Sequence, residues 1–138
     1  MIRRPPRSTL SSSSAASDVY KRQMYGSTNE QFGTSFRSRH KDKKYRYAGK
    51  TGTSQVRRIT EKDRELDLDT SEIEYKNRDH ALFVAFAPYD KPKYAISVLV
   101  EHGGSGSKAA APLAKKLIKK IIDRDKDREI KREELKII

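Results

Sequence analysis

Two short and almost uninterrupted apolar runs constrain the fold of this chain more than any other feature. They are HALFVAFAP, residues 80–88, and YAISVLVE, residues 94–101. Each has the length of a β-strand and is rich in β-branched or aromatic residues, which is typical of strands covered on both faces. The connection between them, PYDKPK, has the composition of a turn. The two runs therefore predict an antiparallel hairpin.

A third strand is expected at about residues 46–56, around the sequence Lys-Thr-Gly-Thr. Thr51 and Thr53 are β-branched, so an extended backbone suits them. Because side chains alternate along a strand, Lys50 and Gly52 should lie on one face, and Thr51 and Thr53 on the other. Gly52 has no side chain, so another molecule could lie close to the backbone there.

An ammonium group, two hydroxyls and free backbone N–H groups at a strand edge suit a carboxylate or a developing oxyanion. The same residues also fit a threonine-rich surface strand with a glycine bulge. A phosphate-binding loop is a third interpretation, because Gly49-Lys50-Thr51 ends like a Walker A motif. That motif requires a glycine where this chain has Lys44, which argues against it.

The composition limits both the size of the core and the available chemistry. The 138 residues suffice for one small domain, and the predicted strands and helix place it in the α+β class. Apolar residues make up 34% and charged residues 36%, so the core must be thin. The absence of cysteine excludes disulfides, thiolate zinc sites and thiol catalysis. No cofactor or metal site is predicted, and no apolar run reaches the ~18–20 residues that span a bilayer.

The net charge of +12 raises nucleic acid or an anionic surface as a partner. The alternative function is therefore that of a small basic nucleic-acid-binding protein, and a helix lying on a membrane surface is a weaker option. Acidic residues are interleaved with the basic ones at 61–79 and 123–134, and such mixed runs are usually solvated surface. We therefore expect no nucleic-acid partner.

Residues 1–23, MIRRPPRSTLSSSSAASDVYKRQ, hold two prolines, six serines and few apolar residues, which predicts disorder. The Arg-Arg pair suggests a twin-arginine or transit sequence, but the apolar core of a secretory signal, about 7–15 residues, is lacking. The stretch also resembles translated sequencing-adapter read-through, in which case it is an artefact. We expect the folded protein to begin near Met24.

The polar segments on either side of the third strand show no sustained period. Residues 24–45 are expected to form loop or a short helix, with His40 facing solvent between two basic neighbours. Residues 57–79 are expected to form a long excursion between strands, with a short hairpin at 66–73.

An amphipathic helix is predicted at about residues 107–124, after a glycine-rich turn. Its apolar stripe recurs at helical spacing and should pack on the hairpin, with lysines on the other face. The stripe comprises Leu113, Leu117, Ile118, Ile121 and Ile122. Pro112 suits the first turn. Residues 123–138 are predicted to be a charged tail; its few apolar residues could extend the helix, but we expect it to fray.

These elements, in this order, resemble the C-terminal end of the transpeptidase domain of class B penicillin-binding proteins. The resemblance covers residues 24–122 and rests on MYGSTNEQFGTS (24–35), YAGKTGTSQV (47–56), HALFVAFAP (80–88) and YAISVLVEHGGSGSKAAAP (94–112). In that family Lys-Thr-Gly is an active-site motif on a strand that lines the site. The resemblance implies a partial penicillin-binding, serine β-lactamase-like fold with three antiparallel strands and a terminal helix.

The resemblance also implies a function. The family cross-links peptidoglycan stem peptides as D,D-transpeptidases, through an acyl-serine intermediate that β-lactams mimic by acylating the same serine. The elongation-type members reside at the periplasmic face of the bacterial inner membrane, held by an N-terminal anchor that is not seen in this chain. Neither a cofactor nor a metal is implied.

By the same resemblance, Lys50 supplies positive potential and helps proton movement around the nucleophile. The hydroxyls of Thr51 and Thr53 hold the substrate's terminal carboxylate. The backbone N–H of Thr53 forms half of the oxyanion hole, a contribution of ~3–4 kcal/mol. Gly52 lets the substrate lie against the strand.

The family's nucleophile lies in a Ser-x-x-Lys motif far upstream of Lys-Thr-Gly, with a Ser-x-Asn motif between them. Three runs here contain matching letters, and we interpret all of them as coincidences. Ser105-Gly106-Ser107-Lys108 follows the Lys-Thr-Gly strand, Ser38-Arg39-His40-Lys41 lies just before it, and Ser27-Thr28-Asn29 has no nucleophile motif ahead of it. Because a nucleophile needs its base, the chain by itself is expected to be inactive.

Overall fold

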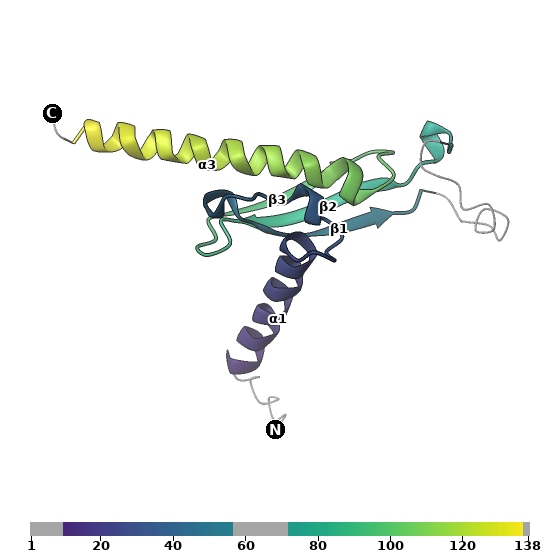
Figure 1. Ribbon diagram of the computed structural model, residues 1–138, viewed down its shortest axis with the longest axis horizontal. Helices are drawn as coiled ribbons and strands as arrows, with labels where there is room; N and C mark the ends of the chain where they lie inside the picture. Colours follow the sequence, from purple (N-terminus) through teal and green to yellow (C-terminus); the bar gives the residue numbers. More distant parts are fainter. Residues whose placement is uncertain (1–9, 57–71, 137–138) are drawn as a thin grey trace, which may run out of the picture.

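The computed structural model describes residues 10–56 and 72–136. Its main elements are α1 (Leu10–Asn29), β1 (Ala48–Ser54), β2 (His80–Ala87), β3 (Tyr94–Val100) and α3 (Ala111–Glu134). Short 3-10 turns occur at Phe36–Ser38, Lys43–Tyr45 and Tyr75–Asn77, and a π-helical turn at Gly106–Ala110 leads into α3. In Figure 1, α3 runs along one side of the sheet and α1 projects from the other.

The three strands form one antiparallel sheet in the order β1-β2-β3. In its register, Gly52 pairs with Leu82, and Leu82 pairs with Leu99. The predicted hairpin and the predicted strand with Lys-Thr-Gly are thus confirmed. Within the described residues β1 is an edge strand, so one side of its backbone lacks a neighbouring strand.

One face of the sheet carries the core. Alternate residues of β2 are buried, among them Phe83, which is fully enclosed. Tyr47, just before β1, meets Phe83 edge to face with ring centroids 6.2 Å apart. Residues of α3 pack over this face. The core comprises Tyr47, Ala81, Phe83, Ala85, Ala87, Val98, Ala110, Ala111, Ala114, Ile118 and Ile122.

The side of α3 that packs on the sheet differs from the predicted stripe. Ala114, Ile118 and Ile122 are buried at intervals of four residues, whereas Leu113 and Leu117 are 44% and 45% exposed. The prediction that these two leucines pack on the hairpin is therefore wrong. Small alanine side chains on the helix and on β2 let the two backbones approach closely, so the bulkier leucines are left beside the contact line.

The helix α3 continues to Glu134, well beyond its predicted end near residue 124. Lys93, in the turn between β2 and β3, contacts Asp125 at 3.8 Å and Glu129 at 3.1 Å. Each exposed ion pair contributes little, ~0.2–1 kcal/mol. However, residues 123–134 contain neither glycine nor proline and are rich in good helix formers. The prediction that the tail frays from residue 123 is thus wrong as far as residue 134.

The expectation of disorder at the N-terminus is wrong for residues 10–23, which belong to α1. Residues 1–9 lie outside the described part of the chain. No proline follows Pro6 in this segment, and Ala15 and Ala16 are strong helix formers. Residues 17–23 are exposed, and burial begins at Met24. The last turns of α1 therefore make its buried contact with the domain.

Most of the connection between β1 and β2 lies outside the described residues. This applies to residues 57–71, and so to most of the hairpin expected at 66–73. In the described part of the chain, neither helix has an apolar stretch of the length that a bilayer requires.

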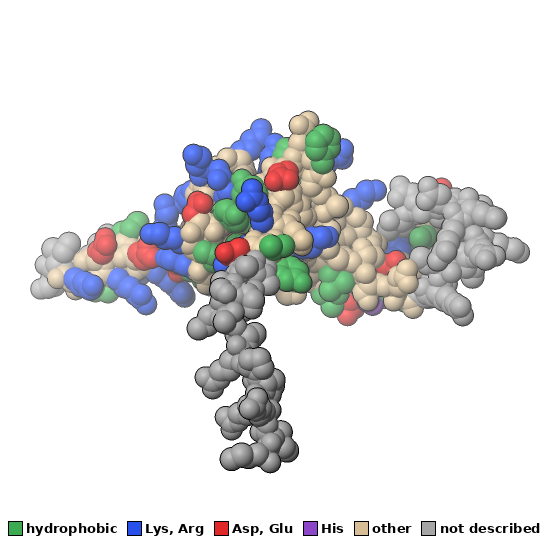
Figure 2. Space-filling model, turned by 90° about the horizontal axis from the view of Figure 1, so that it is seen from below, with side chains coloured by type: hydrophobic (Ala, Val, Ile, Leu, Met, Phe, Trp, Pro, Cys, Tyr) green, Lys and Arg blue, Asp and Glu red, His purple; other side chains and the backbone are tan. Residues whose placement is uncertain are grey.

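Charges of both signs are mixed on one side of the molecule. Figure 2 shows the side of the molecule from which α1 projects, with blue basic side chains over α3 and the domain and red acidic ones among them. This agrees with the interleaved signs in the sequence. A nucleic-acid interface on the side drawn in Figure 2 would instead gather basic residues there without acidic ones among them.

Candidate active site

The outer edge of β1, on the side away from β2, is occupied by side chains from the end of α1. The buried Thr28 hydroxyl accepts a hydrogen bond from the Gly49 N–H at 3.0 Å and donates one to the Gly49 carbonyl at 3.1 Å. The Asn29 amide donates to the Tyr47 carbonyl at 2.9 Å. Two side chains thus replace a neighbouring strand along the first half of β1.

These bonds reveal how the rest of the edge is oriented. Both backbone groups of Gly49 point away from β2, and in an antiparallel strand every second residue shares that orientation. Thr51 and Thr53 therefore also present their backbone N–H and C=O groups outward, past the end of the segment that Thr28 occupies. The accessible part of the edge is short, and it coincides with the Lys-Thr-Gly-Thr sequence.

A chain of hydroxyl groups connects this edge to α1. The Thr34 hydroxyl oxygen lies 3.2 Å from that of Thr51 and 3.0 Å from that of Ser27. The Ser35 hydroxyl lies 3.4 Å from Ser27 and 3.3 Å from Thr28. The Thr51 side chain is thereby oriented by Thr34, whose hydroxyl is connected through Ser27 to the end of α1.

Lys50 is exposed and points to the face of the sheet away from α3. It pairs with Val84, which belongs to that face and is 44% exposed. The Lys50 ammonium donates to the Thr51 carbonyl at 3.2 Å. It also lines a cavity of about 580 Å³, together with Ser27 of α1 and with Glu30 just after it. The Lys50 ammonium is thus a positive charge that lies beside both this cavity and the accessible edge of β1.

The predicted alternation along β1 agrees with the register. Residues that pair across an antiparallel ladder share a face, so Gly52 lies with Leu82 on the Lys50 face, and Thr51 lies with Phe83 on the α3 face. A Cβ added at Gly52 would meet the Leu82 Cβ at 3.4 Å, an ordinary contact. The fold therefore tolerates a side chain there, and the space next to Gly52 is open to another molecule.

The opposite face of β1 is supported by the π-helical turn. A Cβ at Gly106 would stand 2.6 Å from the Gly52 carbonyl oxygen and 2.5 Å from the Leu82 carbonyl oxygen. With no side chain at this position, the turn lies directly on the backbone of β1 and β2. Gly106 thus supports the strand at the residue where the other face is open.

The three serines in motif-like runs make structural contacts. Ser38 is buried, and its carbonyl accepts a bond from the Tyr47 hydroxyl at 2.8 Å. The Ser105 hydroxyl pairs with a neighbouring serine at 3.0 Å. Ser27 does line the cavity with Lys50, although its hydroxyl belongs to the chain described above. The interpretation of the three runs as coincidences stays a prediction.

His40 is half-buried against α3, so the prediction that it faces solvent is wrong. Its Nε2 lies 3.0 Å from the Lys115 carbonyl, and its ring meets that of Tyr47 edge to face, 6.0 Å between centroids. Burial lowers the pKa of His40 below 6.5; the bond to the Lys115 carbonyl opposes this, and the Lys115 and Lys119 charges reinforce it.

A second contact joins the segment before β1 to α3. The Tyr45 hydroxyl and the Lys44 ammonium both donate to the Asp123 carboxylate, the latter at 3.1 Å. The Tyr45 bond, with those of Lys119 and Lys44, holds the pKa of Asp123 well below its usual range, against the effect of desolvation. Because His40 also contacts α3, that helix positions the segment leading into the edge strand.

Sequence reasoning missed Thr28 and Asn29 as residues that position β1. Their hydroxyl and amide groups sit in a polar run beside a glycine-rich segment, which is equally typical of a loop. The signal that identifies them is the three-dimensional distance to Tyr47 and Gly49, about twenty residues away along the chain. A periodicity in one sequence contains no such information.

The antiparallel sheet, its terminal helix and the Lys-Thr-Gly-Thr edge are those of a partial penicillin-binding transpeptidase fold. Consistent with this, the profile of the penicillin binding protein transpeptidase domain matches residues 3–119. The chain belongs to this family. The match gives the nucleic-acid alternative no support.

Individual relatives agree. Peptidoglycan D,D-transpeptidase MrdA of Haemophilus influenzae is 42% identical over 104 residues, 75% of this chain and 15% of that protein. MrdA of Escherichia coli (strain K12) is 31% identical over 113 residues, 80% of this chain and 17% of that protein. The chain thus spans about a sixth of the length of these curated relatives.

Solved structures give the same result. The complex between the penicillin-binding protein PBP2 and MreC from Helicobacter pylori matches with a TM-score of 0.67 and 36% identity, covering 83% of this chain and 18% of that chain. Pseudomonas aeruginosa PBP2 in complex with WCK 5153 matches with a TM-score of 0.57 and 32% identity, covering 86% of this chain and 20% of that chain.

Proposed function

We propose that this chain is the C-terminal part of the transpeptidase domain of a peptidoglycan D,D-transpeptidase. The longer protein cross-links stem peptides during cell-wall elongation through an acyl-serine intermediate. The observation that carries the proposal is the short accessible edge of β1 at Thr51 and Thr53, next to the Lys50 ammonium. Earlier in the same strand, the Thr28 side chain already binds the outward-facing backbone of Gly49. An extended peptide can add to such an edge by backbone hydrogen bonds.

Each residue of the edge has a proposed role. The Thr51 and Thr53 hydroxyls bind the terminal carboxylate of the donor peptide through charge-assisted hydrogen bonds. The Thr53 N–H donates to the carbonyl oxygen that becomes an oxyanion, and loss of one such donor typically costs ~10²–10³ in rate. Gly52 leaves room for the peptide, and Lys50 supplies positive potential and helps proton movement around the nucleophile.

In the proposed reaction, a serine oxygen attacks the carbonyl carbon of the penultimate D-Ala. The peptide bond to the terminal D-Ala breaks, and that residue leaves with a proton on its amine. An amine of a neighbouring stem peptide then attacks the acyl-serine ester and releases the serine. The edge of β1 contributes to both steps by holding the carboxylate or by stabilising negative charge on the carbonyl oxygen.

The serine and its base are supplied, in this proposal, by a part of the longer protein upstream of this chain. The face of the sheet that carries Lys50 supports this. Val84 and Leu99 on that face are 44% and 56% exposed, and an apolar surface of this kind usually marks a contact with further protein. The chain alone is accordingly inactive, with Lys50 lacking its nucleophile.

The location and partners follow from the same proposal. The longer protein acts at the periplasmic face of the bacterial inner membrane, held there by an upstream membrane anchor. β-Lactams acylate its serine in place of the stem peptide. The Helicobacter pylori relative was solved in complex with MreC, so an MreC-like protein is a candidate partner.

Labelling with a fluorescent penicillin tests the proposal. The 138-residue chain should remain unlabelled, whereas the product of the gene extended upstream should be labelled at one serine, located by peptide mass spectrometry. Labelling of Ser38 or Ser105 in the short chain would overturn the proposal. So would an extended product that lacks any acylated serine.

A further inference from the structure

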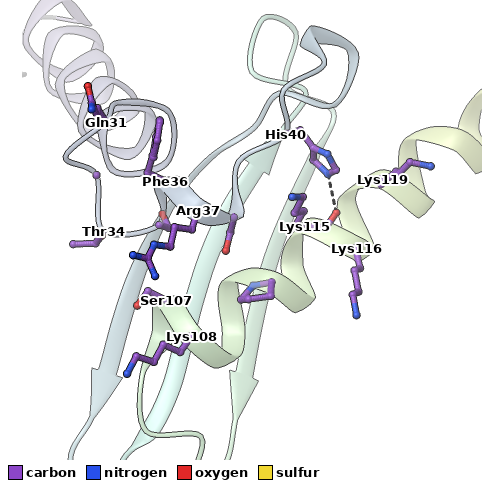
Figure 3. A pocket seen from close by; sticks show the side chains of 14 residues that line it. Gln31, Thr34, Phe36, Arg37, His40, Ser107, Lys108, Lys115, Lys116 and Lys119 are labelled. Atoms are coloured by element: carbon purple, nitrogen blue, oxygen red, sulfur yellow. Dashed lines mark hydrogen bonds between the residues drawn. The ribbon is translucent and has the colours of Figure 1, made fainter. Parts of the chain in front are cut away.

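A second and larger cleft lies on the α3 side of the sheet, between residues 31–40 and the first turns of α3 (Figure 3). Its volume is about 810 Å³, and Phe36 and Pro112 contribute apolar parts of its wall. Gly33 and Thr34 border both this cleft and the Lys50 cavity, but Lys50 itself does not line the cleft. The cleft is therefore distinct from the candidate active site.

Positive charge surrounds this cleft. Its basic residues are Arg37, Lys108, Lys115, Lys116 and Lys119, and none of the described residues that line it is acidic. Lys119 is paired with Asp123 at 3.1 Å, one turn further along α3 and outside the cleft. Several like charges at close range repel one another, so an anionic ligand is favoured in the space between them.

His40 lies in the same wall and responds to this charge. The groups that face it are Lys115 and Lys119 from α3, Asp42 from its own segment, and the rings of Tyr45 and Tyr47. Burial and the two lysine charges lower the pKa of His40, against the opposing effects of the Lys115 carbonyl and Asp42. A bound anion would offset the lysine charges, so His40 serves as a built-in reporter of occupancy.

The arrangement of the basic side chains indicates the kind of ligand. In Figure 3 they leave the wall in different directions and do not converge on one point. A compact anion such as phosphate requires donors that converge on it, so this arrangement suits an extended ligand with several separated negative charges. The site is also hollow, whereas a membrane surface is nearly flat.

We propose that this cleft binds an extended acidic segment of a partner protein. Its carboxylates pair with Arg37, Lys115 and Lys116, and its apolar side chains lie against Phe36 and Pro112. Because these ion pairs are close to solvent, binding should weaken steeply with salt. The inference does not depend on the proposed transpeptidase activity, since none of Lys50, Thr51 and Thr53 lines the cleft.

Fluorescence anisotropy with a labelled Leu-Glu hexapeptide, alternating the two residues, tests the proposal on the 138-residue chain. The matched Leu-Gln peptide, inorganic phosphate and phosphatidylglycerol vesicles are the comparison ligands. We expect the acidic peptide to bind in 50 mM NaCl, at least tenfold more tightly than the Leu-Gln peptide. Failure of the acidic peptide to bind, or stronger binding to phosphate or vesicles, would overturn the proposal.

Charge-reversal variants locate the site. The double variant K115E/K116E should weaken binding of the acidic peptide at least tenfold. The control K120E/K131E changes the net charge equally on the same helix, outside the cleft, and should weaken it less than twofold. Equal losses in both variants would mean that the net charge, and not the cleft, attracts the peptide.

NMR titration of the three histidines provides an independent measurement. The acidic peptide should raise the pKa of His40, whereas the ring resonances of His80 and His102, which lie in and beside the sheet, should not respond to the peptide. A shift shared by all three, or none at His40 under saturating peptide, would contradict the proposal. Because the same comparisons apply to the product extended upstream, the test remains decisive if a variant of the short chain fails to fold.

Discussion

Thr28 occupies the place that a neighbouring strand would take along β1. Its single hydroxyl pairs with both the N–H and the C=O of Gly49 in a fully buried setting. Buried backbone groups without partners cost about 1–3 kcal/mol. The hydroxyl therefore allows β1 to be an edge strand, because it satisfies the outward-facing backbone groups of Gly49, the residue before Lys50.

The variant T28V keeps the shape of this side chain and removes both hydrogen bonds. It should lower the free energy of unfolding by ~1–3 kcal/mol, because two buried backbone groups lose their partner. Urea titration followed by circular dichroism measures the change. T53V makes the same substitution at an exposed position of the same strand and should change stability by less than ~0.5 kcal/mol; equal losses would contradict this role of Thr28.

At the level of residues, the sequence predicts those features of the site that depend only on neighbours along the chain. The alternation of Lys50 and Thr51 follows from the two-residue period of a strand, and the register bears it out. The positions of Thr28 and His40 depend on contacts with distant segments, with Gly49 and with the Lys115 carbonyl. A single sequence specifies no such pairings, and hydrophilic neighbours made His40 look exposed.

At the level of elements, α3 packs through small side chains. Ile118 is a large residue of this contact, 1% exposed, and it shares the core with alanines of α3 and β2. The sequence predicts the strands and the helix from their periods, but a helical stripe wide enough to include Leu113 leaves open which of its sides faces the sheet. The alanines of β2 decide this by allowing the closest approach.

The variant I118A should destabilise the chain by ~2–5 kcal/mol, since it opens a cavity in a thin core. L117A removes an equally large side chain from a position that is 45% exposed, and should cost about 1 kcal/mol or less. Chemical denaturation of both variants measures the difference. If the leucine variant were the less stable, the packed side of α3 would be assigned incorrectly.

Asp123 makes the attachment of α3 dependent on pH. Its folded-state pKa is lowered, so the unfolded chain binds more protons when the pH falls below about 4. The stabilisation is therefore present above the ordinary pKa and is lost as the pH falls through the folded value. D123N should flatten the fall in melting temperature between pH 5 and 2, and thermal melts across this range measure it.

The exposed control for this variant is D127N, one turn further along α3. It should change the free energy of unfolding at pH 7 by less than ~0.5 kcal/mol. D123N should be clearly less stable than the parent at that pH. If the melting temperature of D123N depended on pH as that of the parent does, the contacts of Tyr45 and Lys44 with Asp123 would not stabilise the attachment of α3.

At the level of the whole molecule, we expect the stable part of the domain to begin near Met24. Burial starts at that residue, and residues 17–23 are exposed along α1. Deleting residues 1–23 should therefore leave the free energy of unfolding within ~0.5 kcal/mol of the parent value. Deleting residues 1–29 also removes Thr28 and Asn29 and should destabilise it by several times that amount. A large loss from the shorter deletion, measured by urea titration, would contradict this boundary.

The molecule as a whole presents two different faces of one sheet. The α3 face holds the core and the basic cleft, and the other face holds Lys50 and an exposed apolar surface. This arrangement is expected of a chain that spans about a sixth of its relatives. In the proposed function, the open face is one wall of a site that the rest of a longer protein completes.

The substitution G52A tests most directly whether a peptide or β-lactam lies against the Lys50 face of β1. The fold accommodates a Cβ at this position, so only a bound molecule should meet it. In the product of the gene extended upstream, G52A should lower the rate of acylation by fluorescent penicillin about 10²-fold with an unchanged melting temperature. Acylation at the parental rate would contradict the assignment of this edge as the wall of the active site.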